Sequence, residues 1–279
     1  MSSTKDDRTT TGPTRTDPPG PTTGRVPLTA RQRTLLVVGV LASLLAGAAV
    51  LAVGLPADVM VGEDPLSTLT LPAALAVTLT GVCVLGAAVA RSAWRVVDIV
   101  VAAVLGVAGG LAFVLWNVAV WPGLSGVLPP PVSALFVGVW LLPGVLGGLV
   151  VRRPGAAVFT ELVAASLSAM IGNEWGFATV WYGLLQGLGA EVVLALFLYR
   201  WWRLPVALLA GAGTGLVGGL LDTTVYYPEL VPGVQLTYIA FAVLSGVVIA
   251  GLGSWALTRA LARTGVLAPL ASGRDGRRV

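Results

Sequence analysis

Carboxylate, amide and aromatic side chains gather beside the long apolar segments of this chain. They are Asn117, the run Asn173-Glu174-Trp175, Tyr182, Gln186, Asp222 and Tyr226. Trp175, Tyr182 and Gln186 are separated by seven and four residues, so they would share one helix face. Carboxylates and amides can hydrogen-bond ring nitrogens and an exocyclic amine, and aromatic faces attract a ring cation. We therefore predict a polar heteroaromatic ligand bound by Asn117, Glu174, Trp175, Tyr182, Gln186, Asp222 and Tyr226.

A second interpretation of the same residues stays open. Tryptophan and tyrosine are enriched where membrane helices meet the lipid headgroups. Such an aromatic belt would account for some of the rings, but it accounts poorly for Asn117, Gln186 and Glu174.

Several kinds of chemistry are absent. The chain has no histidine, so it lacks the usual general base and the commonest zinc ligand. Its one lysine is Lys5 and no G-x-x-x-x-G-K-[ST] loop occurs, so it cannot hydrolyse ATP through a P-loop. Cys83 is alone, which excludes a disulfide within the chain. We expect no catalytic residue, no metal site and no cofactor, and an intramembrane enzyme with paired carboxylates is the weakest alternative.

The elements that must position these residues are membrane helices. The chain is 56% hydrophobic and 11% charged, with a mean hydropathy of +0.88. Continuous apolar stretches near the ~20 residues that span a bilayer predict an all-α, polytopic bundle of about eight spans. The expected spans are Leu35–Gly54, Leu69–Ala90, Ile99–Trp121, Val132–Val151, Ala156–Ile171, Phe177–Leu198, Leu204–Leu221 and Leu236–Thr258. Residues 1–33 are too polar to bury a core, and we expect a disordered tail there.

The basic residues give the orientation. All 17 Lys and Arg residues fall on one side of an eight-span topology, in the two terminal segments and in the loops after spans two, four and six. The positive-inside rule makes that side the cytoplasm, so we predict a multi-pass protein of the cytoplasmic (inner) membrane with both termini inside. The opposite loops carry only acidic charges: Asp58, Glu63, Asp64, Glu174, Asp222 and Glu229.

Three carboxylates lie at or within the cytoplasmic ends of apolar spans. Asp98, Glu161 and Glu191 lie toward the cytoplasmic ends of spans three, five and six. Ionisable groups at such depth are costly and tend to have partners or functions. We expect pairing with nearby arginines or protonation; a cytoplasmic contact or gate is the alternative.

Small residues recur at four-residue spacing on span three, as Ala102, Gly106 and Gly110. Such spacing lets helix backbones approach closely. Packing inside the bundle is the default interpretation, and a docking surface for another membrane subunit is the alternative.

From Trp94 onward, several segments in a fixed order resemble one family. They are Trp94 to Gly106, Trp116-Asn117, Gly138 to Pro143, Arg153 to Ala156, Glu161-Leu162, Gln186 to Glu191, Tyr226 to Glu229 and Arg259 to Gly265. Together they are similar to the YkoE-like S components of energy-coupling factor (ECF) transporters, the hydroxymethylpyrimidine/thiamine type. The resemblance covers about 180 residues and six spans.

The resemblance implies a non-enzymatic subunit that binds thiamine or hydroxymethylpyrimidine from outside. Its partners would be a transmembrane coupling (T) subunit and two cytoplasmic ATPases, with docking through Ala102, Gly106 and Gly110. It also implies four segments: a cytoplasmic tail (1–33), a two-helix extension (34–92), a six-helix substrate-binding core (93–273) and a second tail (274–279). The extension has no counterpart in the family pattern, and its second helix could cover the docking face.

Two alternatives keep the membrane bundle but change its role. A stand-alone, ion-coupled secondary transporter of a small cationic or neutral heteroaromatic solute would need a coupling carboxylate, for which Glu161 or Glu191 could serve. A scaffold would need neither ligand nor transport.

Overall fold

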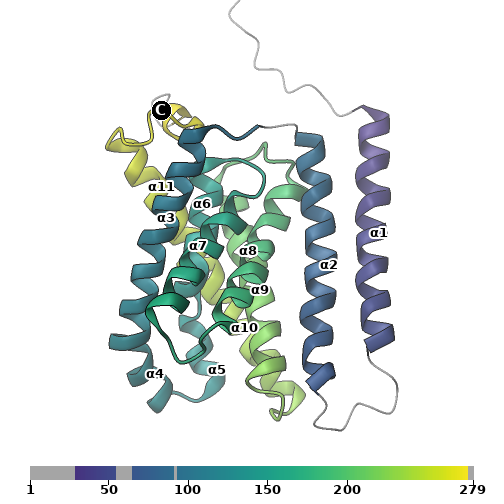
Figure 1. Ribbon diagram of the computed structural model, residues 1–279, viewed down its shortest axis with the longest axis vertical. Coiled ribbons are helices and arrows are strands. Elements are labelled where there is room, and N and C mark those ends of the chain that lie inside the picture. The colour runs from purple at the N-terminus through teal and green to yellow at the C-terminus, as the bar shows by residue number, and fades with distance from the viewer. Residues whose placement is uncertain (1–28, 55–64, 91–92, 276–279) are drawn as a thin grey trace, which may run out of the picture.

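The computed structural model describes residues 29–54, 65–90 and 93–275 of the chain (Figure 1). This described part is helical, with short connecting loops and no strand. The helices are α1 (Ala30–Gly54), α2 (Pro65–Ala90), α3 (Val96–Leu115), η1 (Trp116–Val120), α4 (Trp121–Val127), α5 (Pro130–Ser133), η2 (Ala134–Phe136), α6 (Gly138–Val151), α7 (Ala156–Ile171), α8 (Ala178–Leu196), α9 (Leu204–Val225), α10 (Pro232–Ser245), η3 (Gly246–Leu252), α11 (Gly253–Arg263) and α12 (Ala271–Asp275).

The predicted polytopic helical fold is confirmed. Six described helical segments are long and apolar enough to cross a membrane, and apolar stretches of α1 and α7 are shorter. Together they correspond one by one to the eight predicted spans. Of the predicted tail, residues 1–28 lie outside the described part, and Ala30 to Arg33 already belong to α1. Asp58, Glu63 and Asp64 also lie outside the described residues.

Two of the long spans change helical type along their length. The segment Val96–Val127 passes from α3 through the π-helical η1 into α4, and η3 interrupts the last span in the same way. Single π-helical turns occur frequently at functional sites because they rotate the side chains that follow. In η1 this turn carries Asn117.

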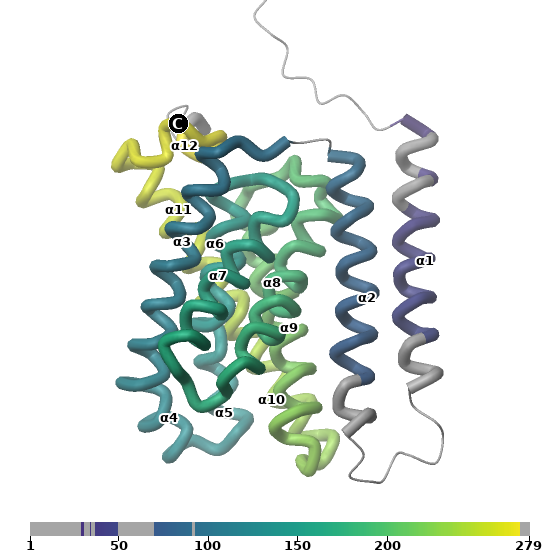
Figure 2. Tube along the Cα trace, in the orientation of Figure 1, coloured from purple at the N-terminus to yellow at the C-terminus, as the bar shows by residue number. Residues whose placement is uncertain are grey.

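The first two helices form a hairpin at one side of the remaining bundle. Within the described residues, α1 packs on α2, and α2 packs on α8 and α9 (Figures 1 and 2). The helix α3 lies on the opposite side of the bundle, so α2 does not cover it (Figure 1). The sequence left open whether the second helix would hide α3, and the structure shows that it does not.

Close backbone contacts hold the bundle together. A Cβ atom built on Gly106 would lie 2.7 Å from the Val163 Cβ and 2.8 Å from the Thr160 carbonyl oxygen, both on α7. A Cβ on Gly215 would lie 2.6 Å from the Ala242 carbonyl oxygen of α10. Glycine at these positions allows helix approaches that a larger residue would prevent.

At the end of the bundle that carries the arginines, one buried carboxylate pairs with two of them. The Asp98 side chain is fully buried; its Oδ1 lies 2.7 Å from Arg95 Nη2, and its Oδ2 lies 2.9 Å from Arg153 Nε. Arginine pairing is therefore confirmed for Asp98.

Glu191, by contrast, accepts hydrogen bonds from the N–H groups of Gly155 (2.6 Å) and Ala157 (2.9 Å), at the N-terminus of α7. A carboxylate is stabilised there by the helix dipole and by otherwise unpaired N–H groups.

Candidate ligand-binding site

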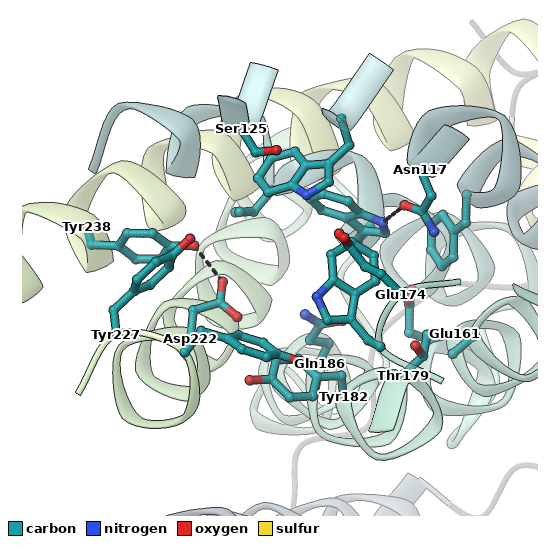
Figure 3. A pocket seen from close by; sticks show the side chains of 18 residues that line it. Asn117, Ser125, Glu161, Glu174, Thr179, Tyr182, Gln186, Asp222, Tyr227 and Tyr238 are labelled. Atoms are coloured by element: carbon teal, nitrogen blue, oxygen red, sulfur yellow. Dashed lines mark hydrogen bonds between the residues drawn. The ribbon is translucent and has the colours of Figure 1, made fainter. Parts of the chain in front are cut away.

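A cavity of about 320 Å³ lies at the end of the bundle opposite the arginines. Figure 3 shows its lining side chains. All seven residues predicted to bind a ligand line it: Asn117, Glu174, Trp175, Tyr182, Gln186, Asp222 and Tyr226. Further lining residues that the sequence did not single out as ligand contacts include Trp121, Trp140, Glu161, Thr179, Tyr227 and Tyr238.

Positions along the helices give the cavity a mouth and a floor. Glu174 and Trp175 lie in the loop after α7, and Tyr226 directly follows α9. Glu161 precedes the end of α7 by ten residues, and Gln186 lies eight residues into α8. At 1.5 Å per residue these two lie roughly 15 Å and 12 Å below the loop ends of their helices. The cavity therefore extends well into the membrane-spanning part of the bundle.

One wall of the cavity is built around Trp140. Its ring meets those of Trp121, Trp175 and Trp116 edge to face, with centroids 4.7, 5.8 and 6.1 Å away. Its indole N–H donates a hydrogen bond of 2.9 Å to Asn117 Oδ1. Edge-to-face rings and a paired indole N–H favour one fixed orientation of Trp140. Asn117 thus faces the cavity and also holds its main aromatic wall.

The loop that carries Glu174 and Trp175 is held by Asn173. The Asn173 Oδ1 accepts hydrogen bonds of 3.0 Å from the Trp175 N–H and from Thr179 Oγ1, and its Nδ2 donates to Ser168 Oγ at 3.1 Å. Gly172 and Gly176 flank the loop with φ of +111° and +56°, values that favour glycine. The turn is therefore specified by sequence and presents Trp175 to the cavity.

The opposite wall is phenolic. The Tyr238 hydroxyl donates a hydrogen bond of 2.8 Å to Asp222 Oδ2. The ring pairs Tyr227–Tyr238 and Tyr182–Tyr226 have centroids 5.2 and 5.5 Å apart. The pKa values of the Tyr226 and Tyr227 phenols are raised above the ordinary value, mainly by burial and secondly by the neighbouring Asp222 carboxylate. Both phenols stay protonated at neutral pH and can donate hydrogen bonds.

The floor holds a carboxylate that the sequence analysis placed near the cytoplasm. Glu161 is 1% exposed, and its Oε2 accepts a 2.6 Å hydrogen bond from the Gly144 N–H of α6. Its Oε1 has no hydrogen-bond partner among the described protein groups. With Glu174 and Asp222, three carboxylates line the cavity, and none of the described Lys or Arg residues does. Such a lining attracts cations and repels anions.

The three small residues predicted for docking face inward. Ala102 is fully buried, and Gly106 and Gly110 are buried against α7. This placement agrees with packing inside the bundle, whereas the exposed face of α3 is formed by Val100, Val104, Val107 and Leu111. A docking role for the small residues stays a prediction.

The comparisons with known proteins agree with this architecture. The pattern of a family described as "ABC-type cobalt transport system, permease component" matches residues 97–217. The putative HMP/thiamine permease protein YkoE of Bacillus subtilis (strain 168) is 32% identical over 187 residues, which cover 65% of this chain and 92% of the relative. A crystal structure of an S component of an ECF transporter superposes with a TM-score of 0.64 at 31% identity, covering 67% of this chain and 94% of that one.

A multi-pass helix bundle with a cavity at one end, matched by that structure, defines a substrate-binding membrane subunit of an ECF importer, a non-enzymatic transport protein. More closely, the chain belongs to the family of YkoE-like S components. The predicted family is therefore confirmed.

Proposed function

We propose that this S component captures thiamine or its hydroxymethylpyrimidine precursor in the cavity lined by α3, η1, α4, α6, α7, α8, α9 and α10. The observation that carries the proposal is the lining itself. Three carboxylates, two amides and aromatic rings surround about 320 Å³, and the described lining includes no Lys or Arg. That volume is within the usual range of small-molecule sites, roughly 300–1,000 Å³. The name of the Bacillus relative, an HMP/thiamine permease, supports the same ligand class.

Each part of the ligand has chemistry to match. The aminopyrimidine ring offers an amine and ring nitrogens, which carboxylate and amide groups such as Asp222 and Gln186 can hydrogen-bond. The thiazolium ring of thiamine is a permanent cation, which gains from carboxylates and from aromatic faces such as Trp175 and Tyr182. The same lining would disfavour phosphorylated forms of the vitamin, because their charge is negative.

The remaining parts of the importer would supply the energy. The chain has no P-loop, so ATP hydrolysis falls to two cytoplasmic ATPases coupled through a T subunit. We propose that the arginine-bearing end faces the cytoplasm of an inner membrane and that the cavity faces outward. The T subunit would contact α3, and use of Ala102, Gly106 and Gly110 would require α3 to move away from α7.

The proposal is tested by binding to the purified protein. Trp121, Trp140 and Trp175 line the cavity, so thiamine or the pyrimidine should quench tryptophan fluorescence in a saturable way. Thiamine monophosphate should bind more weakly than thiamine. A matched control is Trp181→Phe, since Trp181 is 67% exposed and does not line the cavity; the quenching should survive this change. Absence of a saturable response to both ligands would remove the proposal.

The position of Glu161 also fits a second function, that of a stand-alone secondary transporter. A stand-alone secondary transporter needs a carboxylate at mid-membrane that can exchange a proton, and Glu161 is buried there beside the cavity. Proteoliposomes that contain this chain alone should show no thiamine uptake when a proton gradient is imposed. Uptake under those conditions would favour the secondary transporter.

A further inference from the structure

The least explained group in the cavity is the Glu161 carboxyl. It is 1% exposed and lines the floor, and Figure 3 shows it on the side of Asn117, away from Asp222 and Tyr238. One oxygen is occupied, because Oε2 accepts the Gly144 N–H at 2.6 Å. The other oxygen, Oε1, lacks a hydrogen-bond partner among the described protein groups.

An unpartnered oxygen at this depth is costly. Leaving a buried acceptor without a hydrogen bond costs on the order of 1–3 kcal/mol, and more for a charged group. The local structure is nevertheless built to hold the carboxyl there. A Cβ atom on Gly144 would lie only 2.9 Å from Glu161 Oε2, so glycine leaves room for this approach. Glu161 is thus fixed by α6, with one acceptor left without a hydrogen-bond partner in a residue that lines the cavity.

We infer that Glu161 determines specificity at the floor of the cavity, where its free oxygen accepts a hydrogen bond from the exocyclic amine of the ligand's aminopyrimidine. This inference rests on the proposed function and deepens it. A contact between the amine and Glu161 would orient the ligand. The amine would lie at the floor of the cavity, and the opposite end of the ligand would remain near the mouth. There Glu174 and Tyr226 lie among the groups that would surround a ring cation.

The hydrogen bond between the Gly144 N–H and Glu161 Oε2 allows a test by amide substitution. In Glu161→Gln the amide oxygen must face the Gly144 N–H, because two donors would otherwise oppose each other. The amide NH₂ then faces the cavity, and an acceptor becomes a donor with little change in shape. A 4-amino ligand presents a donor to this position, whereas the 4-oxo analogue of thiamine presents an acceptor. The substitution should therefore reverse the preference between the two ligands.

The experiment measures dissociation constants for thiamine and for its 4-oxo analogue on full-length protein. Wild type should prefer thiamine. Glu161→Gln should bind thiamine about 10- to 100-fold more weakly, because two donors would then meet and leave a buried group without a partner, and should bind the 4-oxo analogue as well as wild type does or better. The matched control is Glu174→Gln, which makes the same carboxyl-to-amide change at the mouth and should weaken both ligands to a similar extent.

The possible failures can be told apart. If wild type binds neither ligand, the proposed function itself is wrong. If wild type binds thiamine but Glu161→Gln keeps the same affinity for it, or weakens both ligands equally, the role of Glu161 is wrong and the proposed function stands. Should the variant fail to fold, the wild-type ratio decides: equal affinity for the two ligands contradicts the inference, and a preference for the amine supports it.

Discussion

The indole of Trp140 meets three other tryptophan rings and donates to Asn117, so the aromatic wall acts as one unit. Trp175 is the member that comes from the loop at the mouth. We predict that Trp175→Ala weakens thiamine binding by about tenfold, since loss of one ring stacked on a base costs roughly 1–3 kcal/mol. Equilibrium dialysis with radiolabelled thiamine measures this without relying on fluorescence. Trp181→Ala, in the exposed part of α8, should leave the affinity within about twofold.

The hydroxyl of Tyr238 gives a second prediction for a single side chain. It donates to Asp222 Oδ2 at 2.8 Å, and the Tyr238 ring is 2% exposed. Tyr238→Phe keeps the ring packed on Tyr227 but leaves the carboxylate without this donor. We expect the free energy of unfolding to fall by about 1–2 kcal/mol, which thermal denaturation in detergent can measure. An unchanged melting temperature would mean that this hydrogen bond contributes nothing to stability.

The packing of α3 on α7 positions both Asn117 and Glu161. A Cβ on Gly106 would lie 2.7 Å from the Val163 Cβ, so Gly106→Ala must push the two helices apart. We predict a destabilisation of about 1–3 kcal/mol, typical of overpacking, with weaker ligand binding. Gly123→Ala is the matched control, because a Cβ there meets nothing within 4 Å; it should be neutral or slightly stabilising. Equal melting temperatures for the two variants would contradict this account.

Sequence reasoning located the helices well because apolar length is read directly from the residues. It gathered seven cavity residues because they lie in the loops on one side of the spans or in the halves of the spans next to those loops. It missed Glu161 as a lining residue because α7 has only 16 residues. Glu161 lies near the proposed cytoplasmic end of α7, but the helix is so short that Glu161 still reaches the cavity, which opens at the opposite end of α7. Trp140 and Tyr238 were missed for another reason: their partners, Asn117 and Asp222, are 23 and 16 residues away in sequence. Hydropathy does not report such contacts between helices.

The first two helices pack beside the helices that form the cavity. None of the described residues of α1 and α2 lines the cavity, and α2 contacts the bundle through α8 and α9. We predict that residues 93–279 alone insert into the membrane and bind thiamine within about threefold of the full chain, because lipid can cover the apolar faces of α8 and α9. Comparing the two proteins by equilibrium dialysis tests the proposed boundary between extension and core. Loss of binding would show that the extension belongs to the binding unit.

The proposed orientation can be tested on whole cells. The sole cysteine, Cys83, is buried, so new cysteines can be labelled selectively. A membrane-impermeant maleimide added outside should label Ser125→Cys, at the mouth of the cavity, and should reach Arg263→Cys only after lysis. Both substituted residues are exposed. The reverse pattern would place the cavity on the cytoplasmic side.

The central claim is that this cavity holds the vitamin. The most direct measurement is an experimental structure of the protein with bound thiamine. We predict density for the ligand beside Trp175 and Tyr182, with its amine within hydrogen-bond distance of Glu161 Oε1. Density for thiamine at another place on the protein, with this cavity filled by its own side chains, would contradict the account.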